Sequence, residues 1–179
     1  NHVFVLEEIG KDANGDKIKE RRNGKGARVY GVNMDAKLAH GKEAQFQLGF
    51  TAQRSRYKTA EQWTGDDEEA LFTKKMTRTP DYYGYFTFTS APLKNFDFSL
   101  SGVYTGEMQV PHMAGYIEKS RMETSPDFLT VNLKLNYTVT LKDKVKMQFN
   151  TGIQNAFNSF QKDLDQGVMR DAGYFYGPT

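Results

Sequence analysis

Hydrophobic and polar residues alternate with a period of two over most of this chain. The alternation is clear in residues 30–38, and it resumes in residues 44–51 after the short polar stretch His40-Gly41-Lys42. A period of two is typical of a β-strand with one apolar and one polar face. The pattern therefore predicts a β-hairpin with a tight turn.

Two further hairpins and one further strand are predicted by the same rule. Their strands are expected at residues 81–90 and 96–101, at 129–141 and 145–154, and at 3–9. The two additional turns are expected at residues 91–95 and 142–144. The fold class is therefore expected to be all-β, an antiparallel up-and-down meander of about seven strands.

The connections between these strands alternate between short and long. The long polar connections are expected at about residues 10–27, 56–79 and 107–126, with another that begins near 160. Outer-membrane barrels show this asymmetry, because their periplasmic turns are tight and their extracellular loops are long. Strands of about 10 to 13 residues also suit a tilted crossing of a bilayer. We therefore expect a partial transmembrane β-barrel with its apolar face toward lipid and its polar face toward a wet lumen.

Tyrosines near the predicted strand ends fit this expectation without proving it. They are Tyr30, Tyr57, Tyr82, Tyr83, Tyr104 and Tyr137. Such residues form the interfacial girdles of membrane barrels, and they are equally common as β-formers in soluble sheets.

The composition excludes several classes of protein and site, but it does not indicate a function. A chain of 179 residues with a net charge of +2 fits one domain and predicts no nucleic-acid partner. Cysteine is absent, which excludes a disulfide framework and thiolate metal sites. No apolar stretch reaches the roughly 20 residues of a spanning helix, and Asn1-His2-Val3 does not begin a signal peptide.

The sequence contains no pattern typical of an enzyme. Its three histidines, His2, His40 and His112, are far apart, and we find no nucleophile motif, phosphate loop or metal-ligand spacing. We therefore predict no enzymatic activity, no catalytic residue, no metal site and no cofactor.

Two acidic stretches have simpler structural interpretations. Residues 66–69 are all acidic and open a stretch of helical composition, 68–76, where acidic residues suit a helix start. Asp12, Asn14 and Asp16 faintly resemble a calcium loop, but the glycine at position six and the glutamate at position twelve are lacking. We expect a turn there instead.

Two sets of residues are candidates for ligand binding. In the stretch GEMQVPHMAGY, residues 106–116, the side chains of Met108, His112, Met113 and Tyr116 could contact a metal complex, a haem or a corrinoid. The alternative is that Met108 merely packs the loop. A second candidate surface consists of Arg170, Asp171, Tyr174 and Tyr176. Its arginine could pair with an anionic ligand, or these residues could merely hold the last loop together.

The tail of the chain carries three short motifs, NAFN at 155–158, FQKD at 160–163 and RDAGYFYGP at 170–178. In this order they resemble the C-terminal end of TonB-dependent outer-membrane receptors of the Bacteroidetes type. Similar pieces are RRNG at 21–24 with ARVYGVN at 27–33, and YTG at 104–106 with VPHMAGY at 110–116. The resemblance spans nearly the whole chain.

This resemblance implies that residues 1–179 are the C-terminal part of a receptor barrel in the bacterial outer membrane. The family imports a scarce nutrient, such as an iron chelate, haem, cobalamin or glycan, with energy supplied through TonB. It also has an N-terminal plug, a TonB-contacting segment and one last strand, which this chain lacks. About seven strands cannot close a barrel of about 22.

The expected partners are outer-membrane lipid, the small nutrient and, through the N-terminal segment, the TonB complex. Open sheet edges and an apolar face also predict self-association. Two alternatives remain open: a passive outer-membrane porin, which lacks the tail motif, and a soluble β-sheet ligand-binding module, which would be a compact monomer without detergent.

Overall fold

The structure is a computed structural model that describes residues 4–41, 43–63, 71–142 and 145–178. Within these residues the chain forms strands, turns and loops and no helix. Accordingly, none of them belongs to a helix long and apolar enough to span a membrane. The strands are β1 (Phe4–Lys11), β2 (Lys17–Asn23), β3 (Ala27–His40), β4 (Ala44–Gln62), β5 (Phe72–Lys75), β6 (Tyr82–Leu93), β7 (Phe96–Thr105), β8 (Gln109–His112), β9 (Arg121–Thr124), β10 (Phe128–Leu141) and β11 (Val145–Ile153).

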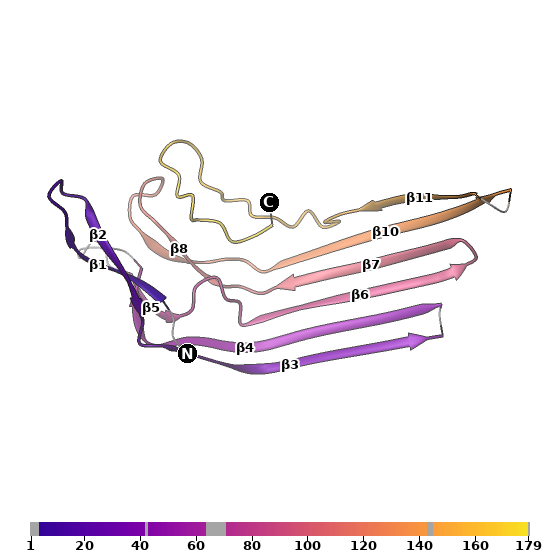
Figure 1. Ribbon diagram of the computed structural model, residues 1–179, viewed down its shortest axis with the longest axis horizontal. Coiled ribbons are helices and arrows are strands. Elements are labelled where there is room, and N and C mark those ends of the chain that lie inside the picture. Colours follow the sequence, from indigo (N-terminus) through magenta and orange to yellow (C-terminus); the bar gives the residue numbers. More distant parts are fainter. Residues whose placement is uncertain (1–3, 42, 64–70, 143–144, 179) are drawn as a thin grey trace.

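One seven-stranded antiparallel sheet dominates the molecule (Figure 1). Its strand order is β11-β10-β7-β6-β4-β3, and β5 pairs with the far end of β4. The three predicted hairpins are β3–β4, β6–β7 and β10–β11, and each pairs in antiparallel register. The all-β antiparallel meander is thus confirmed, with β3 and β11 as its edges in the described chain.

Two expectations about the N-terminal region were wrong in part. The predicted strand at 3–9 corresponds to β1, but β1 pairs only with β2 in a separate two-stranded sheet and does not join the meander. The loop expected at 10–27 contains β2, whose run of charged residues hides any alternation. Asp12 makes the predicted turn, because its carboxylate accepts hydrogen bonds from the backbone N–H groups of Asn14 and Asp16 at 2.8 and 2.9 Å.

The helical composition of residues 68–76 does not produce a helix in the part described. Residues 72–75 form β5, whereas 68–70 lie outside the described residues, as do the acidic residues 66 and 67. The reason is the length of β4, which runs to Gln62 although its pairing with β6 ends at Ala52. Backbone groups of β4 beyond Ala52 need partners, and strand pairing with β5 supplies some of them. Helix propensity is too weak to compete.

The register of the long strands places their apolar positions on one face. One row of paired residues crosses six strands and is entirely apolar: Leu38, Phe46, Phe88, Leu100, Leu133 and Ile153. The next row, one residue along, faces the other side of the sheet and is polar: Lys37, Gln47, Thr87, Ser101 and Asn132. Because successive side chains of a strand point to opposite faces, the sheet has one apolar and one polar surface.

The apolar surface of the sheet is open. Val32 is 71% exposed and Leu38 is 68% exposed. Large side chains on β10 and β11, such as Tyr137 and Phe149, are also more than half exposed. The hydrophobic cluster of the described chain lies elsewhere, around β8 and the C-terminal segment, and Tyr57 on β4 and Phe128 at the start of β10 are buried near the loop end of the sheet. The sheet therefore does not form the core of this structure.

The tight turns lie at one end of the sheet and the long connections at the other (Figure 1). Gly41, Asn95 and Lys142 stand in the tight turns with positive φ values of 55°, 72° and 48°. The opposite end carries the β1–β2 hairpin, β5, the β8–β9 hairpin and the C-terminal segment. The predicted asymmetry is confirmed, but the connection expected at 107–126 contains a hairpin of its own.

Candidate functional site

The chain turns away from the sheet after β11 and folds back beside the β8–β9 hairpin (Figure 1). Asn155 starts this change with a φ of 47°, a left-handed value that asparagine tolerates well. Its backbone N–H donates to the Asn132 side chain on β10, and its own side chain accepts from the N–H of Ser159. The β8–β9 hairpin together with residues 155–178 is called the loop cluster below.

The loop cluster has a small hydrophobic core. Val110 is fully buried, Met108 and Tyr174 are 7% and 4% exposed, and Tyr176 packs against them. Met108 and Ser125 close the base of the hairpin through two hydrogen bonds, one from each backbone N–H. Thus β8, which is only four residues long, is held by packing against the C-terminal segment.

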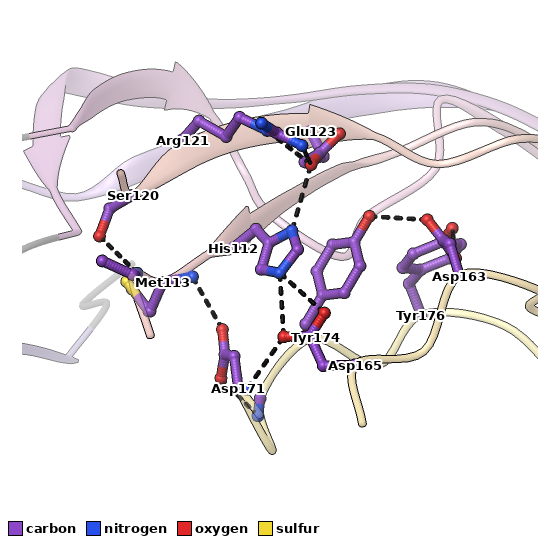
Figure 2. A network of polar contacts seen from close by, with 12 residues as sticks. His112, Met113, Ser120, Arg121, Glu123, Asp163, Asp165, Asp171, Tyr174 and Tyr176 are labelled. Atoms are coloured by element: carbon purple, nitrogen blue, oxygen red, sulfur yellow. Dashed lines mark hydrogen bonds and ion pairs between the residues drawn. The ribbon is translucent and has the colours of Figure 1, made fainter. Parts of the chain in front are cut away.

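His112 at the end of β8 joins three segments (Figure 2). Its Nδ1 lies 3.1 Å from Glu123 Oε1 on β9, and its Nε2 lies 3.1 and 3.0 Å from the two carboxylate oxygens of Asp165. The imidazole stacks on the ring of Tyr174, with centroids 3.6 Å apart and planes 9° apart. The side chains of His112 and Asp165 are only 5% and 2% exposed, so this contact is shielded from water.

Asp163 accepts hydrogen bonds from two tyrosine hydroxyls of the same segment. Tyr174 donates to Oδ2 at 2.9 Å, and Tyr176 donates to Oδ1. Burial disfavours ionisation of Asp163, but hydrogen bonds, first those from Tyr176 and Tyr174, outweigh it and lower the pKa of this carboxyl. Burial and then the bond to Asp163 raise the pKa of Tyr174 above its ordinary value, and raise that of Tyr176 to about 12.

Asp171 fixes backbone rather than side chains. Its carboxylate accepts from the N–H of Met113 at 2.9 Å and from the N–H of Gly173 at 2.7 Å. Its own N–H donates to Asp165 Oδ2 at 3.0 Å. Asp171 therefore links the loop after β8 to the carboxylate that contacts His112.

The structure brings together some of the predicted ligand-binding residues and separates others. Met108, His112 and Tyr174 are buried and in one cluster, which matches the packing interpretation of Met108. Met113 is half-buried, and Tyr116 and Arg170 are exposed. The two predicted surfaces are thus parts of one loop cluster.

Four carboxylates of this cluster were not recognised as a group in the sequence. They are Glu123, Asp163, Asp165 and Asp171. Only Asp171 lies within the predicted candidate surface, because the others are scattered in polar loops where acidic residues are common. The only signal available was the recurrence of aspartate in residues 163–171 beside the aromatic residues 174–176.

Within the described residues, no group of three or more acidic or histidine side chains is arranged to hold a metal ion. Around His112 the two carboxylates lie on opposite ring nitrogens. Each carboxylate thus contacts the imidazole itself, and the site is a hydrogen-bond chain.

The polar face of the sheet has a second, smaller network. The hydroxyl of Tyr85 accepts from Gln47 at 2.9 Å and donates to Asp35 at 3.3 Å. Its ring lies over Gly49, where any Cβ atom would fall 2.2 Å from the ring. Polar side chains on this face therefore form hydrogen bonds with side chains of neighbouring strands.

Comparison with known proteins gives no relative for this chain. No family model, no curated protein and no solved structure matches it. The site is therefore interpreted from its own geometry.

Proposed function

We propose that this chain forms part of the wall of an outer-membrane β-barrel. The observation that carries the proposal is the two-faced sheet, whose exposed apolar surface extends across six strands while the opposite surface carries amides, hydroxyls and charges. An exposed apolar area of this extent is costly in water and favourable in lipid. The wet lumen of a barrel suits the polar surface.

The length of the apolar surface agrees with the thickness of a bilayer. On β10 it runs from Leu129 to Leu141. At about 3.4 Å per residue that distance is about 41 Å, and a strand tilted by about 45° would cover about 29 Å of depth. The apolar band of outer-membrane barrels is about 25 Å tall and the hydrocarbon core about 30 Å thick.

Several tyrosines support the same orientation. Tyr30, Tyr82 and Tyr104 share the apolar surface near the loop end, and Tyr137 lies on it near the turn end. These are the positions where interfacial girdles are expected. Tyr83, on the polar face, and Tyr57, only 9% exposed, do not fit a girdle.

We further propose that the wall belongs to a TonB-dependent receptor that imports a scarce nutrient, an iron chelate, haem, cobalamin or glycan. The tail sequence and the long connections gathered at one end of the sheet support this receptor interpretation. A passive porin would share the two-faced sheet, and it would carry no energy dependence. In a receptor of this kind, the loop cluster would lie at the extracellular end of the barrel.

The membrane proposal is tested by single-cysteine labelling, which is clean because the chain has no native cysteine. Leu133→Cys on the apolar face and Lys134→Cys on the polar face are each labelled with a fluorophore in lipid vesicles. We expect quenchers attached to lipid chains to act on position 133, and aqueous iodide to act on position 134. A detergent-free monomer in which lipid-chain quenchers reach neither position would overturn the proposal.

The receptor proposal needs a separate measurement in cells that produce the full-length gene product. Uptake of labelled iron chelate, haem, cobalamin or oligosaccharide should stop when the proton-motive force is dissipated. Uptake that continues unchanged would favour the porin instead.

A further inference from the structure

The contacts of His112 cannot all be satisfied by a neutral imidazole between two ionised carboxylates. A neutral ring has one N–H donor and one nitrogen lone pair. Yet Nδ1 lies 3.1 Å from Glu123 and Nε2 lies 3.0 Å from Asp165. With a single proton on the ring, one of these nitrogens would direct its lone pair at a carboxylate oxygen in a shielded site.

One additional proton removes this conflict. Placed on the second ring nitrogen or on Asp165, it gives both short contacts a hydrogen. The surrounding charges then balance, because Arg121 lies 2.7 Å from Glu123 on the outer side. The neighbouring Asp163 and Asp171 are occupied by tyrosine hydroxyls and backbone N–H groups.

We infer that the loop cluster is a proton-dependent clasp, in which the C-terminal segment docks on the β8–β9 hairpin only when the Glu123–His112–Asp165 triad holds this additional proton. The proton count belongs to the triad as a coupled unit. Glu123 lies on β9, whereas Asp165 and the stacked Tyr174 come from the C-terminal segment, so loss of the proton weakens a contact between separate segments. This inference goes beyond the proposed function and does not depend on a membrane.

The direction of the pH dependence follows from linkage. Above the pKa of the undocked triad, the docked state binds about one proton more than the undocked state, so docking weakens as pH rises. Over that range the docking constant should fall about tenfold per pH unit, and at lower pH it should not change.

The test measures hydrogen-exchange protection of residues 159–176 in the full chain in detergent micelles, corrected for intrinsic exchange, from about pH 5 to about pH 8. The wild-type chain should lose protection as pH rises. Asp165→Asn should stay protected at the upper pH, because an amide can donate to the neutral ring while its oxygen still accepts from the N–H of Asp171. His40→Gln, in the distant turn, is the matched control and should behave as the wild type.

Two results of the exchange measurement would overturn the inference. One is wild-type protection that does not change with pH, and the other is an Asp165→Asn variant that is loosened equally at every pH. Because a variant can fail to fold, nuclear magnetic resonance of the wild-type His112 ring nitrogens and the Asp165 carboxyl provides a second measurement. A docked state with a neutral ring and an ionised Asp165 would contradict the clasp, and an additional proton on either group would support it.

Discussion

Val110 in the loop cluster is fully buried, whereas Leu38 on the sheet is 68% exposed, although both lie on strands of one chain. The loop cluster buries a small core of Met108, Val110 and Tyr174 and satisfies its carboxylates internally, although Val168 and Met169 on its loops are exposed. The sheet instead presents a continuous apolar surface and holds itself together by backbone pairing along strands of up to 19 residues. Under the proposed function, the buried core and internally paired carboxylates suit the loop cluster to water, and the open apolar surface suits the sheet to lipid.

The largest expected effect comes from placing a charge on the apolar surface. Leu135→Arg, midway along the apolar positions of β10, should destabilise the chain in lipid vesicles by about 2 to 4 kcal/mol, because an arginine near the bilayer midplane loses its hydration. Thr138→Arg, on the polar face of the same strand, is the control. Urea titration of both variants gives the free energies of unfolding. Equal losses would break the distinction between the two faces.

A smaller effect is expected from opening the core of the loop cluster. Val110→Ala removes fully buried methyl groups and should cost about 2 kcal/mol. The loss should appear as faster hydrogen exchange in the loop cluster, with the sheet unchanged. Val168→Ala, at a position 99% exposed, should change nothing measurable. If the sheet also lost protection, the two regions would form one cooperative unit.

A still smaller effect is expected from removing the hydroxyl of Tyr174 in the loop cluster. Tyr174→Phe deletes the hydrogen bond to Asp163 and should destabilise the loop cluster by about 1.5 kcal/mol, the lower end for a bond to a charged acceptor. Exchange protection of residues 159–176 is the measurement. Tyr116→Phe, on an exposed side chain, is the matched control, and a similar loss in both variants would argue against a specific role of this bond.

The smallest expected effect is at the alkaline limit of the loop cluster. The folded pKa of Tyr176, about 12, lies above the usual value of about 10. The stability that its protonated hydroxyl gives the loop cluster is therefore fully present below about pH 10 and is lost as pH rises through 12. Phenolate absorbance followed against pH should show late ionisation of this residue. Asp163→Asn should make Tyr176 ionise at lower pH, and an unchanged titration curve would contradict a contribution of the Asp163 hydrogen bond to the raised pKa.

The lowered pKa of Asp163 has the opposite consequence. It gives the loop cluster stability that is present above the unfolded carboxyl pKa of about 3.9 and is lost in acid.

The alternation of residue types was sufficient to predict the three long hairpins and the two faces of the sheet. In a strand the side-chain period is two, so polarity along the chain directly maps onto the faces. The sequence also predicted the tight turns, because residues such as Gly41 and Asn95 tolerate positive φ. All of these features depend on local chemistry.

Tertiary structure alone decided the placement of β1, the formation of β5 and the assembly of the loop cluster. Whether β1 joins the meander depends on its partner β2, and β5 forms because β4 extends beyond β6. His112 and Asp165 are 53 residues apart, and no local pattern connects them. Their contact exists because β11 ends at Ile153 and the chain turns at Asn155 and folds back, and pairings between distant loop residues are set by packing rather than by residue periodicity.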